Sequence, residues 1–409
     1  MKNRFFFIVA LLLAFGLFFG GLVWLNIQIL DYVEAGEHFL VSWIRARAFL
    51  FSGQSPYSEA VLQDVQVAVY GRYALSGEYS YAFDAPFYKL FVYFPFALIS
   101  NFKIAFAIWL GFAELALAGI GFLSVYLSDW KPSLLSGTLF YLSLFFSFYG
   151  FYPLFGGSGA VFTAFFLLLM LLAIREEWDE ALGLLLLFGT FYPAKGGILF
   201  LLILVWLAYQ GRWQVFSIAF MSMIMLGIVS FLILPSWLSA YYEVLSGTLN
   251  LRYGYLFSAF LMQFSSEYNV ILAEVLRWLF LVILLAEWVR ARARDFSHLL
   301  WVAALSLVLV PFFEMPVSAY FFSLFLFPLP LILKSIEDRW QHYARPFSVF
   351  VLLLTLTAWF GFSRYENNLL LLTFIPPLFL TLGLYWVRWW SLRAPRTWWD
   401  DAHNFKKPA

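Results

Sequence analysis

The sequence predicts an all-α, polytopic membrane protein with about 12 transmembrane helices. Of its 409 residues, 63% are hydrophobic and only 12% are charged, whereas a soluble globular domain carries about 25% charged residues. Apolar runs of roughly 20 residues, long enough to cross a bilayer, recur along the whole chain. No polar block is large enough for a separate soluble domain, so one transmembrane domain over 1–409 is expected.

Composition also excludes several classes of function. The net charge of +1 argues against binding to nucleic acid. The chain has no cysteine, which excludes disulfides, thiol catalysis and thiolate metal sites. Its 4 histidines are scattered, so neither a metal nor another cofactor is expected. The 18 tryptophans and 23 tyrosines suit the aromatic belts at the two membrane interfaces.

The first apolar run, 5–30, is predicted to be a membrane span that is not cleaved. It follows Lys2 and Arg4, and it is too long for the apolar core of a signal peptide. Basic residues before the span place the N-terminus in the cytoplasm. The polar stretch 31–83 is then extracytoplasmic.

This first polar stretch is predicted to form two helices. Apolar residues recur at helical spacing at Phe39, Trp43, Ala46 and Leu50. Arg45 and Arg47 lie off this apolar face, which predicts an amphipathic helix in the membrane interface. Turn residues at 53–56 end it, and a second short helix is expected near 58–71.

Basic residues set the expected orientation of the later spans. Further apolar segments are predicted at 84–100, 104–127, 133–150, 158–175, 180–193, 196–210, 214–234, 269–289, 298–312, 316–333, 347–363 and 369–388. Basic clusters at 290–294, at 334–345 and from 388 onward are cytoplasmic by the positive-inside rule, which includes the tail 391–409. A second polar stretch, 235–268, is therefore expected outside, on the same face as 31–83.

One early segment is predicted not to cross the membrane. Thirteen spans would place the basic C-terminus outside, so twelve spans and one re-entrant or irregular piece are expected. Two segments contain helix-breaking residues: 84–100, with Pro86 and Pro95, and 133–157, with Pro153 and two glycines. Irregular backbone at membrane depth is found where it lines a cavity.

Two motifs resemble a known family. They are FLVSWIRARAFLFSGQSPYS at 39–58 and PFYKLFVYFPFALI at 86–99. They are similar to the helix ending in Gly-x-x-Pro-Tyr and the following Pro-Phe-Ala-Leu span of the GT-C glycosyltransferases, in particular the bacterial mannosyltransferases that use polyprenyl-phosphate sugars. The matching residues are Gly53, Pro56, Tyr57, Pro86, Tyr88, Pro95, Phe96, Ala97 and Leu98.

The resemblance implies transfer of a hexose, of the mannose type, from a polyprenyl-phosphate donor to an extracytoplasmic acceptor hydroxyl. The protein is then expected in the plasma or inner membrane, with the lipid-linked sugar as its partner. An acceptor hydroxyl needs a general base, usually a carboxylate. The leaving lipid phosphate needs cations or strong hydrogen-bond donors.

At four positions the sequence departs from the family pattern. The family's Asp position is His38, its Gly-Gln reads Gly157-Ser158, its Lys-Pro-Gln reads 192–194, and its Arg falls at Glu314. Each change removes a group that the chemistry requires. The resemblance therefore implies a retained fold whose ordinary activity is altered or lost.

Other residues in the sequence offer groups for the two chemical roles, the general base and the binding of the lipid phosphate. The candidate catalytic residues are His38, Glu37 and Asp31. The alternative for each is a polar residue at the membrane surface without a catalytic role. Glu34 is placed to orient His38 if the helix extends that far. The candidate residues for binding substrate or lipid phosphate are Lys195, Tyr192, Ser158 and Arg252. For Lys195 and Arg252, a lysine or arginine snorkelling to water is the alternative.

Three classes of function remain open for this sequence. The first is a hexosyltransferase with a rearranged site. The second is a non-catalytic subunit of a membrane complex, or a binder of lipid or glycan, with protein partners. A transporter or lipid flippase ranks last, because transporters often show internal repeats and none is evident in the sequence.

Overall fold

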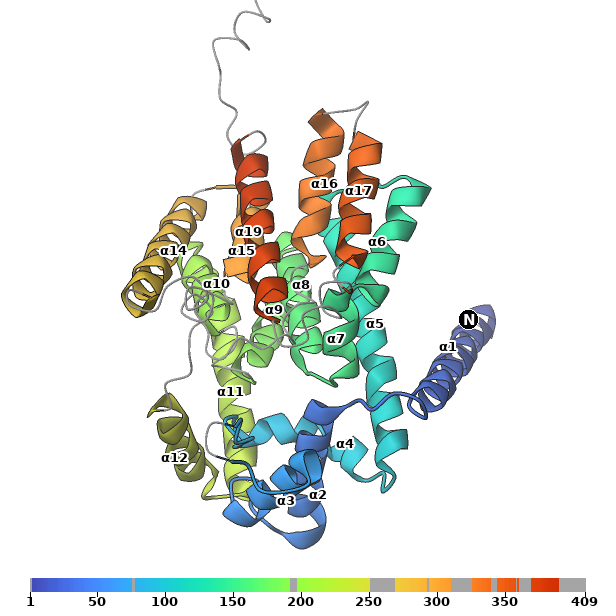
Figure 1. Cartoon of the computed structure of the whole chain (residues 1–409), viewed down its shortest axis with the longest axis vertical. Coiled ribbons are helices and arrows are strands. Elements are labelled where there is room, and N and C mark those ends of the chain that lie inside the picture. The colour runs from blue at the N-terminus through green and yellow to red at the C-terminus, as the bar shows by residue number, and fades with distance from the viewer. Residues whose placement is uncertain are drawn as a thin grey trace, which may run out of the picture. The chain divides into compact units, whose positions relative to one another are not determined.

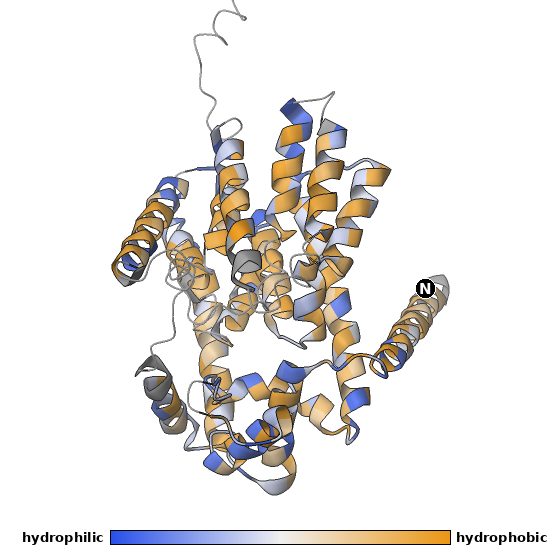
Figure 2. Cartoon of the chain, in the orientation of Figure 1, coloured by the Kyte–Doolittle hydropathy of each residue, from blue (hydrophilic) through white to orange (hydrophobic). Residues whose placement is uncertain are grey.

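The computed structural model is all-helical in the residues that it describes, with no β-strand among them. These residues are 2–75, 78–191, 197–250, 269–292, 294–309, 326–339, 344–357, 359 and 369–389. Figure 1 shows the course of the chain, and Figure 2 shows how strongly apolar most of the helices are. The prediction of an all-α protein is confirmed for this part of the chain.

The chain divides into two compact units. Unit 1 comprises 1–120, 150–197 and 212–253, and unit 2 comprises 121–149, 198–211 and 254–409. That both units belong to one transmembrane domain stays a prediction.

Four helical stretches are long and apolar enough to cross a membrane, counted over the described residues. They are Val9–Ile29, Phe102–Ser128, Leu134–Phe155 and Trp213–Ile233. At 1.5 Å rise per residue, 21 residues extend about 30 Å, the thickness of the hydrocarbon core. The first stretch lies within α1 (Lys2–Ile29), and the second and fourth are α5 and α11. All three coincide with predicted spans, and their length and composition are consistent with a membrane protein.

Two segments, 84–100 and 133–157, are the candidates for the piece that does not cross the membrane. Of these, 84–100 has the irregular structure. It forms a 3₁₀ helix η1 (Phe87–Val92) of 6 residues and a helix α4 (Phe94–Ala97) of 4 residues, neither of which can cross a bilayer. Pro86 and Pro95 stand at the starts of these helices, where the missing N–H does the least harm. The other candidate segment forms α6 (Leu134–Phe146) and α7 (Phe148–Phe155).

The segment 180–193 also departs from the prediction of a simple span. It is divided between α9 (Asp179–Leu185) and the 3₁₀ helix η2 (Leu186–Thr190). Ahead of it in unit 1 is α8 (Ala160–Arg175). The stretch after η2 to residue 196 lies outside the described residues.

Both helices predicted in the first polar stretch are present. Helix α2 (Glu37–Ser52) begins after Gly36 and ends at Gly53, whose φ angles of 89° and 63° are left-handed and suit glycine. Helix α3 (Glu59–Tyr70) is capped by Ser58, whose side chain accepts a hydrogen bond from the Val61 N–H.

The prediction that Arg45 faces away from the packed side of α2 is wrong. Its side chain is only 3% exposed, donates a hydrogen bond to the Tyr81 carbonyl and lies 5.2 Å from the Phe83 ring centre. Burial lowers the pKa of Arg45 to about 10, so the guanidinium stays charged at neutral pH. Helix α2 is therefore packed on more sides than an amphipathic surface helix.

Two further side chains of α2 bind the irregular segment. Arg47 Nη1 donates to the Ala97 carbonyl at 2.8 Å, and Trp43 Nε1 donates to the Phe96 carbonyl at 3.1 Å. Tyr57, from the turn after α2, donates its hydroxyl to the Ala85 carbonyl at 2.8 Å. The bonds to Ala97 and Ala85 satisfy carbonyls that a broken helix leaves without intrahelical partners, while the Phe96 carbonyl also accepts from Ile99 N at 3.1 Å.

The start of the second polar stretch lies against this same region of unit 1. Helix α12 (Trp237–Asn250) packs on η1, and the rings of Trp237 and Tyr88 are 6.1 Å apart. Trp237 belongs to one hydrophobic cluster with Phe39 and Phe83 of the first stretch. This placement agrees with the expected common face of 31–83 and 235–268, whose side of the membrane stays a prediction.

Unit 2 is a bundle around the buried helix α15 (Phe296–Leu309), in which every residue from His298 to Leu309 is buried. Trp301 of α15 donates to the Leu384 carbonyl of α19 (Leu369–Val387) at 2.6 Å. On its other side α15 contacts α14 (Asn269–Ala291). Unit 2 also contains α6, α10 (Gly197–Tyr209), α16 (Pro328–Arg339) and α17 (Ala344–Leu356), with α17 beside α6 and α16 (Figure 1).

Replacing Gly157 with alanine is expected to destabilise unit 1 by about 3 kcal/mol. The residue has φ +70°, and an added Cβ would lie 2.9 Å from Phe39 Cβ and 3.2 Å from Gly36 Cα. Left-handed strain contributes roughly 1–2 kcal/mol and overpacking roughly 1–3 kcal/mol. The measurement is thermal unfolding of the purified protein in detergent.

Gly53→Ala is the matched control, because Gly53 also has a left-handed φ (+63°) but has open space around its Cβ position. This variant should lose only the strain contribution, about 1 kcal/mol. Equal losses in the two variants would contradict the close approach of Gly157 to α2.

Candidate functional site

The start of α2 is joined to the loop between α7 and α8 by backbone hydrogen bonds. Gly36 N donates to the Phe155 carbonyl at 2.8 Å, and His38 N donates to the Gly156 carbonyl at 3.1 Å. His38 and Gly157-Ser158, which the sequence analysis singled out, are thereby brought together although they are far apart in the sequence. A shared site would require this proximity, and the sequence alone did not show it.

Ser158 is placed as a structural residue of this junction. Its side-chain oxygen accepts a hydrogen bond from Ala160 N at 3.1 Å, at the beginning of α8. Its own N–H donates to the Pro153 carbonyl at 3.3 Å. A hydroxyl at the N-terminus of a helix commonly satisfies the first backbone donors in this way.

The three candidate catalytic residues lie at the junction or beside it. Glu37 is half-buried and accepts a hydrogen bond from the Tyr81 hydroxyl, whereas Asp31 is exposed and forms an ion pair with Lys103 at 2.5 Å. His38 is half-buried in the first turn of α2. Glu34 precedes the helix and is exposed, so the helical spacing that would place it over His38 does not occur.

Tyr81 donates a hydrogen bond to Glu37, one of the candidate bases. Burial, and then the bond to Glu37, raise the pKa of Tyr81, so its hydroxyl remains protonated and donates to the carboxylate. Tyr70 and Tyr79 surround it, with ring centres 5.5 Å and 4.9 Å away. Glu37 is thus oriented by an aromatic cluster that the sequence did not predict.

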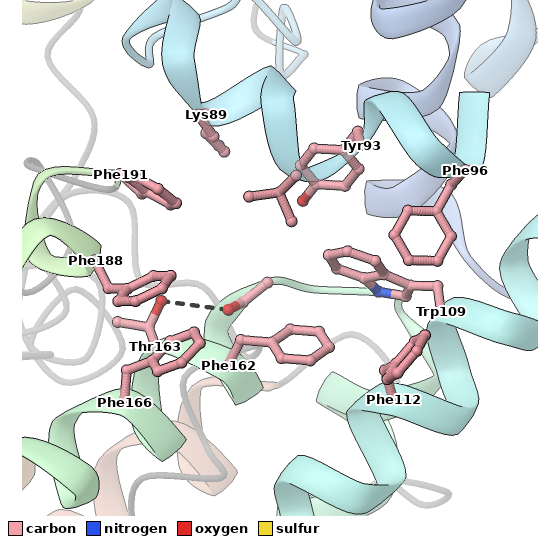
Figure 3. A pocket seen from close by; sticks show the side chains of 12 residues that line it. Lys89, Tyr93, Phe96, Trp109, Phe112, Phe162, Thr163, Phe166, Phe188 and Phe191 are labelled. Carbon is pink, nitrogen blue, oxygen red and sulfur yellow. Dashed lines mark hydrogen bonds between the residues drawn. The ribbon is translucent and has the colours of Figure 1, made fainter. Parts of the chain in front are cut away.

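An aromatic cavity of about 250 Å³ opens beside the junction, within unit 1 (Figure 3). It is bounded by η1, α5, α8 and η2, and eight of its side chains are aromatic. The lining residues are Lys89, Val92, Tyr93, Phe96, Trp109, Phe112, Gly159, Phe162, Thr163, Phe166, Phe188 and Phe191. Such a surface suits an apolar ligand.

Stacked rings hold the cavity wall in place. Phe166 of α8 stacks on Phe188 of η2 with ring centres 3.6 Å apart, and Trp109 of α5 stacks on Tyr93 at 4.9 Å. Phe39 of α2 lies behind this wall, 5.2 Å from Trp109. The junction at His38 and the cavity are therefore neighbouring parts of one packed cluster.

The cavity contains few polar groups. Lys89 enters from η1 and is 8% exposed, with its Nζ 6.0 Å from the centre of the Phe83 ring. Thr163 donates its hydroxyl to the Gly159 carbonyl at 3.3 Å, the dashed line in Figure 3. Trp109 Nε1 is buried without a hydrogen-bond acceptor in the described part of the chain. An anionic group near Lys89 and an apolar chain along the aromatic wall would match this arrangement.

The other predicted binding residues cannot be placed in this site. Tyr192, Lys195 and Arg252 lie outside the described residues, as does Glu314. Phe191, the last described residue before Tyr192, lines the cavity and packs 5.7 Å from Tyr88.

Neither the aromatic lining nor Tyr81 was identified from sequence. In a chain with 51 phenylalanines, a pair spaced four apart such as Phe162 and Phe166 indicates only a helix face. The described residues contain no group of three or more histidine, aspartate or glutamate side chains placed to hold a metal ion.

Comparison with known proteins returned no matching family model, no matching curated protein and no matching solved structure.

Tyr81→Phe is expected to destabilise the protein by about 1 kcal/mol, because the half-buried Glu37 loses its hydrogen-bond donor. Thermal unfolding in detergent measures the effect. Tyr73→Phe is the control, since Tyr73 is 58% exposed in the same stretch, and it should change the stability by less than about 0.5 kcal/mol. Equal effects of the two substitutions would contradict the role given to Tyr81.

Proposed function

We propose that the protein is a membrane-embedded hexosyltransferase of the GT-C type that takes its hexose from a polyprenyl-phosphate donor. The observation that carries the proposal is the junction of His38 and Gly157-Ser158 beside the aromatic cavity. The family resemblance assigns both positions to one reaction centre, and their proximity is what that assignment requires. The twelve-span topology, with both termini cytoplasmic and the junction outside, is part of this proposal.

The cavity supplies a rationale for donor binding. The isoprenoid chain would lie along the rings of Trp109, Phe162 and Phe166, since apolar and aromatic walls favour a hydrocarbon ligand. Lys89 would attract the phosphate, because a cation in a low-dielectric site interacts strongly with an anion. The donor would thus be held by its lipid and phosphate, with the sugar toward the junction.

The transfer itself requires one proton acceptor. The acceptor hydroxyl attacks C1 of the hexose, the bond from C1 to the phosphate oxygen breaks, and the polyprenyl phosphate leaves with the bonding electrons. The hydroxyl proton passes to the base, which is Glu37 or His38. A carboxylate held by Tyr81 is oriented for this role, and an imidazole can accept a proton near neutral pH.

A second candidate function is non-catalytic binding of a lipid-linked sugar as a subunit of a membrane complex. The favouring observation is that both candidate catalytic carboxylates already have partners, Glu37 with Tyr81 and Asp31 with Lys103. The loss of the family's acidic residue at position 38 favours the same function. In this case the protein keeps the cavity that binds the lipid but lacks the groups that catalyse the transfer.

Donor binding is tested by native mass spectrometry of protein released from its own membrane in mild detergent. A bound polyprenyl-phospho-hexose is expected. Lys89→Met should weaken its retention about tenfold or more, because a charge-assisted contact is lost. Lys131→Met, which removes an exposed lysine between α5 and α6, should leave retention unchanged. Absence of any such lipid from the wild-type protein would overturn the proposal.

Catalysis is tested by transfer of radiolabelled hexose from polyprenyl-phosphate mannose to an acceptor glycan. Loss of the general base should lower the rate at least about 100-fold, so Glu37→Gln and His38→Ala identify which residue serves. If the wild-type protein retains the lipid but shows no turnover, the non-catalytic function is correct. Wild-type rates from both variants would exclude these residues as the base.

A further inference from the structure

The C-terminal end of α14 in unit 2 carries a cluster of arginines. Arg290, Arg292 and Arg294 are all exposed, the side chain of Arg290 by 57%. Arg388 follows α19 and lies beside them, because its Nη1 and that of Arg290 both donate to Glu287 Oε1, at 2.5 Å and 3.0 Å. We call these four residues the arginine patch.

The carboxylates near the arginine patch do not neutralise it. Glu287 is 3% exposed and its Oε1 is shared by Arg290 and Arg388, while Asp295 is exposed at the start of α15. Two carboxylates therefore face four guanidinium groups in the part of unit 2 that the structure describes. The patch carries an excess of positive charge on an accessible surface.

An apolar stripe on α14 leads directly to the patch. Its exposed side chains follow one helix face at alternating spacings of four and three: Ile271, Val275, Trp278, Val282, Leu285 and Val289. These 18 residue steps extend about 27 Å, close to the roughly 30 Å thickness of a bilayer core. The stripe ends at Val289, next to Arg290, so the arginines begin where the hydrocarbon would end.

Aromatic residues lie near the arginine patch, at the end of the apolar stripe. Trp389 is 54% exposed and directly follows Arg388 in sequence. The Arg388 guanidinium lies 5.2 Å from the Trp301 ring centre and 5.8 Å from that of Tyr385, which holds it in position. Tryptophan and arginine together are typical of the headgroup region of a membrane.

We propose that the arginine patch binds the phosphate groups of anionic phospholipids. Arginine forms paired hydrogen bonds with phosphate oxygens, and the patch lies at the end of a helix, α14, that has a lipid-length apolar face. Zwitterionic lipids carry the same phosphate but no net charge, so the excess positive charge selects anionic headgroups. This inference is independent of the proposed transferase function.

The experiment uses full-length protein in nanodiscs of phosphatidylcholine with increasing phosphatidylglycerol, followed by native mass spectrometry of retained lipid. The wild-type protein should retain phosphatidylglycerol in preference to phosphatidylcholine. Each arginine removed should weaken this preference about fivefold, since one basic residue near the surface contributes about 1 kcal/mol. Arg294→Gln and the double variant Arg292→Gln/Arg294→Gln test this without disturbing the bonds to Glu287.

Arg277→Gln is the matched control, because Arg277 lies on the same helix and pairs with Glu274 at 3.3 Å, far from the patch. It should keep the wild-type preference, and Arg294→Lys should keep most of it. Equal retention of the two lipids by the wild-type protein would overturn the proposal. So would a loss in Arg277→Gln as large as in Arg294→Gln.

Discussion

The close approach of two backbones, at Gly36 and Gly157, is the constraint on which the described part of unit 1 depends. Both residues have left-handed φ angles, and the space that a Cβ on Gly157 would occupy is filled by Phe39, Phe106 and the Gly36 backbone. This contact sets where α2 begins. It also places Phe39 behind the cavity wall, so the junction and the cavity share one packed aromatic cluster.

The irregular segment that follows α3 is stable because side chains of α2 satisfy its carbonyls. Arg47 and Trp43 donate to it, and Tyr57 adds a third bond from the turn. Arg45 donates to the Tyr81 carbonyl just before it. A buried carbonyl without a donor is destabilising by about 1–3 kcal/mol. These donors of α2 and of the turn after it therefore have a structural role, while the site depends on groups that the fold has brought beside them.

The site combines an apolar cavity with few reactive groups. Its rings are held by stacking and are suited to a fixed apolar ligand, and Lys89 is the one cation in the described lining. Glu37 is engaged by Tyr81, and Asp31 is engaged by Lys103. The two proposed functions share the ligand and differ only in whether Glu37 or His38 accepts a proton, which is why lipid retention and turnover distinguish them.

Local chemistry in the sequence determined the helices, and tertiary contacts determined the site. Composition and apolar length predicted an all-helical chain with helices able to cross a membrane, and glycine and serine at the right places predicted the ends of α2 and α3. Periodicity placed Arg45 off the apolar face, yet it is buried, because the Tyr81 carbonyl, 36 residues away, supplies its partner. The hydrogen bond of His38 N to the Gly156 carbonyl and that of the Tyr81 hydroxyl to Glu37 join residues distant in sequence. Such pairings leave no local pattern in the sequence, so only the tertiary structure decided them.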